Sequence, residues 1–361
     1  MSFTQPEAAT LSEEKREGSC LEWDVFKDLL DDRGNPRLSC ARHLFLQDLD
    51  QEDLPVLMEA FKFWRDYAEY LGIKGENRIN GKKMFLAVKC SKRGNDVFSW
   101  RLDRRLGFLG MLKDVRLFKP EDFKPTRLVK TNLLWVTLTY DPRLRSLEAA
   151  WQHIMEEWNL WITNLRNRYG KIDVLRFIEA FPDEKGSAYG YPHLHVVLLF
   201  READFRVFPN MEEGKDGKLG LIYRIQEMPE VRDQGNWHSF IDVKALSSGK
   251  ALGSYVRKYC QKTHYGDAPG ALVTQALLWL HRKQTFSMSS GFRSQLLDLI
   301  TDMQGSKGVW AQKTLEGGLL DDWIWSCHGV RSAGELGVDP GIWVESLEEE
   351  KFHQVFGGIG R

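Results

Sequence analysis

The sequence has no long hydrophobic run and no nucleotide-binding loop. No stretch of about 18 consecutive apolar residues occurs in the 361 residues, so we expect no membrane span. The polar and acidic residues 1–18 contain no apolar stretch that could serve as a secretory signal. No GxxxxGK(S/T) sequence is present, which excludes a P-loop ATPase. The hydrophobic content of 42% is sufficient for a buried core, and we expect a cytoplasmic globular protein that does not use ATP.

Cysteine is scarce, and its spacing is irregular. The five cysteines are odd in number, widely separated and never arranged as CxxC. This excludes a disulfide framework and a zinc ribbon, and it favours a reducing compartment. Cys327 and His328 are adjacent, but no second Cys/His pair stands at the spacing of a zinc site.

Charge is balanced overall but unevenly distributed. The formal net charge is −1. Residues 78–145 carry seventeen Lys and Arg against six Asp and Glu, and residues 243–293 carry eight against one, whereas both ends of the chain are acidic. Because each Lys or Arg that contacts a phosphate releases counterions, the two basic segments favour a nucleic acid partner. A solvated surface on which the two signs meet in the fold is the alternative.

The composition divides the chain into four parts. The first part contains a helical pattern over residues 54–71, and the second contains two strand-like pieces, 84–89 and 97–102, which together predict a hairpin. The parts are an acidic N-terminal region (1–77), a basic β-rich accessory segment (78–125), a core (126–300) and a Trp-rich acidic C-terminal region (301–361).

The core gives the clearest pattern. A strand at 133–140 is followed by an amphipathic helix that begins after Ser146, a favourable N-cap residue, and ends at Gly170. Two further strands, at 174–181 and 193–200, are joined by a short link. This β-α-β-β order predicts an α+β fold with a central antiparallel sheet and helices. A further strand and two helices are expected at 239–243, 249–262 and 271–282.

Two histidines separated by one residue could share a metal ion. Within a strand, His193 and His195 project from the same face. Simple burial of both imidazoles is the alternative, but two other HxH sites are excluded. An HxHxDH hydrolase needs Asp at position 197, which is Val, and a cupin-like site needs Glu at 199–200, where Leu and Phe stand. Glu179 is the candidate third ligand, because a carboxylate in an apolar strand needs a partner. Such a site suits Mn²⁺ or Mg²⁺ and leaves positions open for water or a phosphate oxygen.

The sequence YVRKYCQK, residues 255–262, contains two interleaved Y-x-x-K units. On a helix, both tyrosines and both lysines fall within about one third of the circumference. These residues are Tyr255, Lys258, Tyr259 and Lys262. Amphipathic packing, with half-buried tyrosines and lysines that extend to solvent, is one interpretation. The other is chemical: a phenol with a pKa near 10 is a weak nucleophile, and a metal-polarised phosphate and a nearby ammonium would assist its attack.

In combination, these motifs resemble the HUH endonucleases, and among them the two-tyrosine rolling-circle replication initiators of plasmids and phages. WVTLTYDP (135–142) resembles their first motif, PHLHVVLLF (192–200) their metal-binding motif and YVRKYCQK their tyrosine motif, in the expected order. KQTFSMSSGFR (283–293) resembles the Ser-rich basic segment often found after the tyrosine helix. The resemblance covers about residues 125–295 and implies an RRM-like or ferredoxin-like nuclease core.

The resemblance implies nicking and joining of single-stranded DNA at a replication origin. A divalent ion held by His193, His195 and Glu179 would polarise the scissile phosphate. Tyr259 would attack first and form a 5′-phosphotyrosine linkage, and Tyr255 would act after one round so that the displaced circle is closed.

The resemblance also implies further roles and partners. Lys258 and Lys262 would orient the phosphate or stabilise developing charge, and Trp100, Phe118 or Phe292 would either stack on bases or pack in the core. Without an ATPase motif, strand separation would depend on a host helicase or on supercoiling, and a host DNA polymerase would extend the new end. A transposase or relaxase with the same chemistry and a non-catalytic origin-binding protein are the alternatives.

Overall fold

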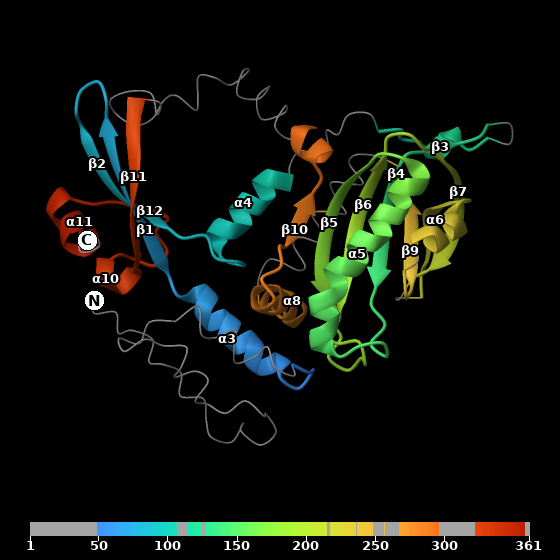
Figure 1. Cartoon of the computed structure of the whole chain (residues 1–361), viewed down its shortest axis with the longest axis horizontal. Coiled ribbons are helices and arrows are strands. Elements are labelled where there is room, and N and C mark those ends of the chain that lie inside the picture. The colour runs from blue at the N-terminus through green and yellow to red at the C-terminus, as the bar shows by residue number, and fades with distance from the viewer. Residues whose placement is uncertain are drawn as a thin grey trace.

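Three antiparallel sheets and several helices make up the chain, as Figure 1 shows. The computed structural model describes residues 49–106, 115–124, 127–214, 217–235, 237–247, 256, 267–295 and 322–357. The expected α+β class with antiparallel strand pairing is confirmed. In the described ranges, no helix has the length and apolar character needed to cross a bilayer.

A five-stranded antiparallel sheet, here called the core sheet, carries the candidate site. In spatial order its strands are β10 (Phe286–Met288), β5 (Ile172–Ala180), β6 (Pro192–Phe200), β4 (Leu133–Thr139) and β9 (Ile241–Ala245). The inner strands β5 and β6 are buried along their whole length. This burial on both faces explains why both strands appear in the sequence as nearly continuous apolar runs.

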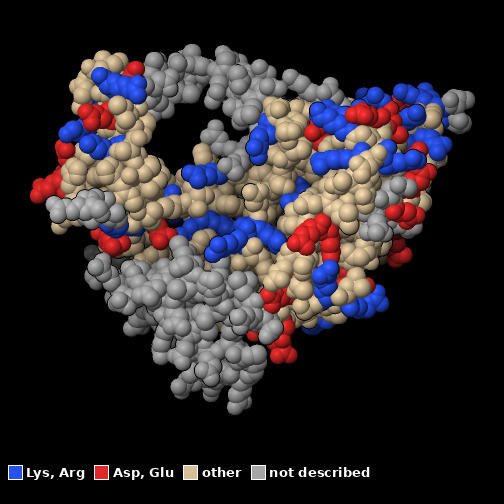
Figure 2. All heavy atoms as spheres, viewed as in Figure 1, with Lys and Arg blue, Asp and Glu red and all other residues tan. Residues whose placement is uncertain are grey.

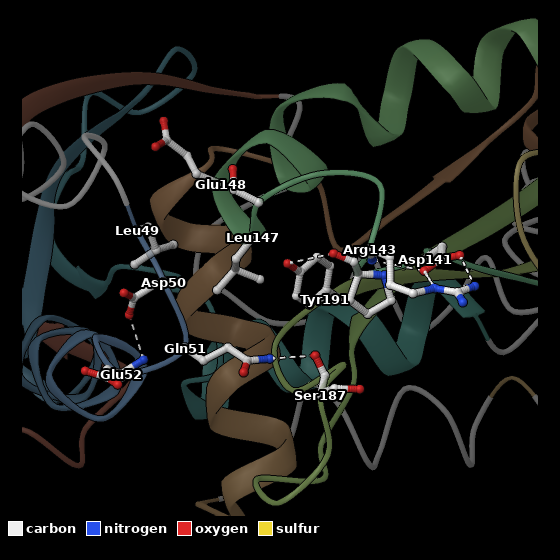
Figure 3. Close-up of a pocket in the computed structure, with 12 residues that line it drawn as sticks. Leu49, Asp50, Gln51, Glu52, Asp141, Arg143, Leu147, Glu148, Ser187 and Tyr191 are labelled. Atoms are coloured by element: carbon white, nitrogen blue, oxygen red, sulfur yellow. Dashed lines mark hydrogen bonds and ion pairs between the residues drawn. The ribbon is translucent and has the colours of Figure 1, made fainter.

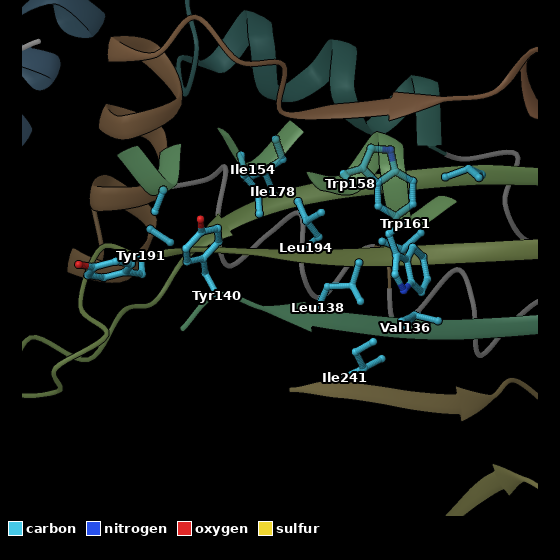
Figure 4. Packing of buried hydrophobic residues seen from close by; sticks show 14 of the residues in the cluster. Val136, Leu138, Tyr140, Ile154, Trp158, Trp161, Ile178, Tyr191, Leu194 and Ile241 are labelled. Carbon is cyan, nitrogen blue, oxygen red and sulfur yellow. The ribbon is translucent and has the colours of Figure 1, made fainter. Parts of the chain in front are cut away.

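The helix α5 (Leu147–Tyr169) covers one face of the core sheet. Ser146 caps it by accepting a hydrogen bond from the backbone N–H of Ala149 at 3.3 Å, and Gly170 ends it with a φ of 77°. The expected strand-helix-strand-strand order is therefore confirmed, with its caps. The contact in Figure 4 is made by Ile154, Trp158 and Trp161 of the helix and by Val136, Leu138, Ile178 and Leu194 of the sheet.

Other elements surround the core sheet. The helix α8 (Pro269–Leu280) packs against β5 and against α3 (Leu54–Asp66). Over residues 205–223, where the sequence pattern is mixed, a hairpin extends the core as a small sheet of its own. This hairpin sheet consists of β3 (Lys130–Thr131), β7 (Phe205–Glu213) and β8 (Leu219–Ile225), and the short helices η3 (Pro120–Asp122) and α6 (Met228–Gly235) lie near it in the chain.

A second four-stranded sheet, here called the outer sheet, lies at the opposite end of the molecule from the hairpin sheet (Figure 1). Its strands are, in spatial order, β11 (Trp323–Ser332), β1 (Glu69–Asn77), β2 (Lys83–Lys89) and β12 (Val344–Ser346), and α10 (Ala333–Leu336) and α11 (Glu349–Phe356) pack beside it. Glu69 pairs with Ser332 across more than 250 residues of chain. The outer sheet thus combines strands from both sides of position 77/78 with strands from the C-terminal region.

The expected strand at 97–102 is wrong, because these residues lie in the helix α4 (Asp96–Leu106). The alternating apolar residues of this segment resemble a strand pattern. However, the Asn95 side chain accepts a hydrogen bond from the backbone N–H of Phe98 at 2.9 Å, which is the interaction of a helix N-cap. The turn-forming residues before this segment therefore start a helix rather than connect two strands.

The helical pattern over 54–71 is confirmed only in its first part. The helix α3 ends at Asp66, where Tyr67 adopts an extended conformation with a ψ of 108°. Leu71, which fits the helical spacing, lies in β1 instead. Its apolar side chain satisfies both patterns, so the spacing alone could not locate the helix end.

Candidate metal centre

Alternate side chains of β6 lie on opposite faces of the core sheet. Leu194, Val196 and Leu198 pack beneath α5. His193 and His195 therefore project from the other face, which we call the ligand face. The strand has the i, i+2 geometry that the HxH spacing predicts.

Glu179 lies directly opposite His193 in the pairing of β5 with β6. The Nε2 atoms of His193 and His195 each lie 3.2 Å from the same Glu179 oxygen, Oε2. All three side chains are buried, with exposed fractions of 5 to 7%. One ligand atom from each residue lies within 4.8 Å of the other two. We call Glu179, His193 and His195 the ligand cluster.

Two atoms of the ligand cluster, Glu179 Oε1 and His193 Nδ1, are buried without a hydrogen-bond partner. In contrast, His195 Nδ1 lies 3.1 Å from the hydroxyl oxygen of Thr137 on β4. Buried polar atoms without partners are costly, and a cation would satisfy the carboxylate oxygen. Two imidazoles and one carboxylate are a donor set that divalent transition ions such as Mn²⁺ accept. These residues therefore fit a divalent metal ion.

The electrostatics of the ligand cluster favour the protonation states of metal ligands. Burial raises the pKa of Glu179, but the hydrogen bonds from His193 and His195 outweigh burial and bring this pKa down to about 2. For His195, burial lowers the pKa by more than the neighbouring carboxylate raises it. At neutral pH the carboxylate is ionised and the His195 imidazole is neutral, as metal binding requires.

Three residues that the sequence motifs did not single out surround the ligand cluster. Besides the Thr137 hydroxyl, the Trp135 ring stacks on His195 with ring centroids 5.6 Å apart, and the Phe181 ring lies 4.5 Å from His193. Trp135 and Thr137 share a face of β4 because they are two residues apart. The same alternation that identified the HxH pair could therefore have identified them once β4 was known to lie beside β6.

The four predicted catalytic residues, Tyr255, Lys258, Tyr259 and Lys262, lie outside the described residues. Val256, in the same segment, is described and is 1% exposed. It belongs to an apolar cluster on the ligand face. The other members are Leu102, Leu133, Trp135, Leu175, Phe177, Val197, Leu199, Leu246 and Phe292.

Of the three aromatic residues considered for base stacking, two are core residues. Phe118 and Phe292 are 2% and 0% exposed, so neither ring can stack on a base, and that expectation is wrong for both. Trp100 on α4 is 47% exposed, and its ring meets Trp343 edge-on with centroids 5.9 Å apart. Burial separates these residues, whereas the sequence shows only that all three are aromatic.

Basic side chains gather in two places on the face shown in Figure 2. One group forms a band between the outer sheet and the core sheet, and the other covers the end of the core near β3 and β7. The second group is partly neutralised, since Arg127 pairs with Asp122 at 2.8 Å and Arg116 pairs with Asp204. The basic surface agrees with the distribution of charge in the sequence.

A cavity of about 690 Å³ lies at the start of α5, away from the ligand cluster (Figure 3). Its charged lining is mainly acidic, from Asp50, Glu52, Asp141 and Glu148, and its single arginine, Arg143, is paired with Asp141 at 2.7 Å. None of the three candidate ligands lines it. This cavity is therefore separate from the candidate metal centre and is unsuited to a polyanion.

The fold and the ligand cluster define an α+β protein with a candidate divalent-metal centre on an antiparallel sheet. Residues 133–264 are similar to a protein family, the replication-associated protein ORF2 family. The matched range begins with β4, includes the whole ligand cluster and extends past the tyrosine motif at 255–262. The similarity indicates a role in DNA replication. No curated protein and no solved structure matches the chain.

Proposed function

We propose that this protein initiates rolling-circle replication by nicking and rejoining single-stranded DNA at an origin. The observation that carries the proposal is the convergence of Glu179, His193 and His195 on one buried point. It gains weight because these residues lie within the range that is similar to replication-associated proteins. Buried imidazole and carboxylate groups that face one another are the ligands of a catalytic metal site with open positions.

The proposed reaction transfers a phosphate from DNA to tyrosine. A divalent ion, Mn²⁺ or Mg²⁺, supplies charge neutralisation at the scissile phosphate when bound by the ligand cluster. The Tyr259 oxygen attacks phosphorus while the bond to the 3′ oxygen breaks, and the departing 3′ oxygen takes up a proton. The product is a 5′-phosphotyrosine and a free 3′-hydroxyl, which primes synthesis by a host polymerase.

Tyr255 repeats this transfer after one round and releases a closed circle, and Lys258 and Lys262 orient the phosphate. Val256 supports this assignment, because its burial in the ligand-face cluster brings the tyrosine segment to the face that carries the histidines. The energy of the broken bond is retained in the phosphotyrosine, so joining needs no ATP. Strand separation by a host helicase or by supercoiling agrees with the lack of a P-loop sequence.

The proposal predicts a covalent protein–DNA adduct. Purified protein is incubated with Mn²⁺ and single-stranded oligonucleotides that tile the DNA flanking its gene, and adducts that resist denaturation are counted. We expect Tyr259→Phe to abolish the adduct and Tyr255→Phe to retain it. As a matched control, Tyr169→Phe removes a buried hydroxyl without a hydrogen-bond partner and should leave the adduct unchanged.

Two results would contradict the proposal. An adduct in the double variant Tyr255→Phe, Tyr259→Phe would reject the tyrosine nucleophiles, and an adduct unaffected by His193→Ala would reject the metal site. Binding of the oligonucleotides without any adduct would identify a non-catalytic origin-binding protein.

A further inference from the structure

The ligand face ends at an exposed aromatic ring, that of Phe240. Its exposed fraction of 67% is the highest of any phenylalanine or tryptophan in the described part of the chain, and Trp100 follows with 47%. Single exposed apolar residues are common on protein surfaces. The position of Phe240 relative to the ligand cluster is therefore what gives it meaning.

Phe240 lies in one cross-strand row with the ligand cluster. The backbone N–H of Thr139 donates a hydrogen bond to the Phe240 carbonyl oxygen at 3.1 Å, which extends the pairing of β4 with β9 by one residue. Thr139 lies opposite His193, and His193 lies opposite Glu179. Because neighbouring strands are about 4.8 Å apart, Phe240 is on the order of 10 Å from His193.

The alternation of side chains places Phe240 on the ligand face. Ile241 and Val243 pack beneath α5, and Figure 4 shows Ile241 on that side of β9. Phe240, Asp242 and Lys244 therefore share the opposite face, at the edge of the core sheet. In the described part of the chain, no further strand pairs with β9 on its outer side.

The segment that presents Phe240 is held firmly against β4. The Trp237 indole N–H donates a hydrogen bond to the Thr139 carbonyl oxygen at 2.8 Å. The Thr139 hydroxyl donates to the Phe240 carbonyl oxygen at 3.0 Å and lies 3.4 Å from the Ser239 hydroxyl. An aromatic ring on a fixed backbone needs little ordering when a planar ligand stacks on it.

The charges beside Phe240 do not oppose a polyanion. Asp242, on the same face, contacts Lys244 at 3.0 Å and also pairs with Arg224. Two cations therefore neutralise this carboxylate, so a phosphate near the edge of the core sheet meets no unbalanced negative charge.

We infer that Phe240 is a stacking platform for an unpaired nucleobase close to the scissile phosphate. The inference rests on the proposed function, because the ligand cluster defines where the phosphate lies. Every base offers a π-face, so stacking on Phe240 fixes the position of the strand without selecting a sequence. A base held at the end of the row would keep the neighbouring phosphate over the ligand cluster.

The test measures binding of full-length protein to a fluorescent oligo(dT) strand by anisotropy, in EDTA and at fixed salt. We expect Phe240→Ala to weaken binding about 5- to 50-fold and Phe240→Trp to retain it. Phe63→Ala, which removes an exposed phenylalanine on α3, is the matched control and should bind as the wild type does. An abasic strand of the same length should bind Phe240→Ala and the wild type equally, because it has phosphates but no bases.

Wild-type affinity of Phe240→Ala for oligo(dT) would overturn the inference, and so would an equal loss with the abasic strand. Since EDTA prevents nicking, the measurement does not depend on the proposed reaction. A wild type that binds oligo(dT) through Phe240 but forms no adduct with Mn²⁺ keeps the inference and rejects nicking. A wild type that does not bind oligo(dT) rejects both.

Discussion

The two faces of the core sheet use the same strands for opposite purposes. On β6, Leu194 and Val196 complete an apolar core beneath α5, whereas His193 and His195, between and beside them, carry ionisable groups into equal burial. Burial of polar groups costs free energy, so the ligand face is less stable than an apolar face of the same shape would be. The α5 face stabilises the fold, and the ligand face uses part of that stability to hold a candidate metal centre.

The sharpest way to separate the two faces is to truncate neighbouring residues of β6. Leu194→Ala leaves a cavity beneath α5 and should lower the free energy of unfolding by about 2 to 5 kcal/mol. Mn²⁺ should still raise the melting temperature of this variant, because the ligand cluster is intact and the ion binds only the folded state. His195→Ala should lose that shift. Thermal unfolding with Mn²⁺ and with EDTA measures both effects.

The comparison would fail if Mn²⁺ raised the melting temperature of His195→Ala as much as that of the wild type. The ion would then bind elsewhere, and the ligand face would be a packed surface. Leu194→Ala is the control for a general loss of stability.

Local signals in the sequence predicted most of the core sheet. The strand ends, the Ser146 cap and the Gly170 terminus are encoded within a few residues, and the alternation of side chains placed both histidines on one face. A carboxylate in an apolar strand identified Glu179. These features need no knowledge of distant contacts, which explains why they could be predicted.

What the sequence did not reveal depends on pairings between distant segments. The pairing of Glu69 with Ser332 leaves no local trace, so the outer sheet was not expected. Thr137 and Phe240 gain their positions from the neighbours of β4, and only the sheet order shows them. The α4 segment was wrong for a local reason, because Asn95 suits a turn and a helix cap equally.

A histidine on the α5 side extends the comparison to pH. His281 stacks on Trp151, and its Nε2 atom is buried without a hydrogen-bond partner. Burial, aided by the charge of Lys283, lowers the pKa of His281 to about 3. The unfolded chain takes up this proton near pH 6.5 and the folded chain does not, so stability falls as the pH drops from about 6.5 towards 3.

Between pH 7 and pH 5 this histidine should lower the free energy of unfolding by up to about 2 kcal/mol. His281→Phe keeps a ring against Trp151 and should remove this part of the pH dependence. Urea unfolding of both proteins at the two pH values measures the difference. Parallel pH profiles would show that His281 is protonated in the fold and that burial on this side does not exclude charge.

The smallest effect concerns a residue that acts on the ligand cluster through another residue. The Thr137 hydroxyl can accept a hydrogen bond from His195 Nδ1–H, which leaves the Nε2 lone pair directed at Glu179 and at an ion beside it. Thr137→Val keeps the shape of the side chain and removes this bond, so Mn²⁺ affinity measured by calorimetry should fall about 10-fold. Thr139→Val is the matched control on the same strand and face, since its hydroxyl contacts Ser239 and Phe240 but no metal ligand. If both variants bound Mn²⁺ equally well, the hydroxyl would not position His195, and the ligand face would owe its geometry to packing alone, as the α5 face does.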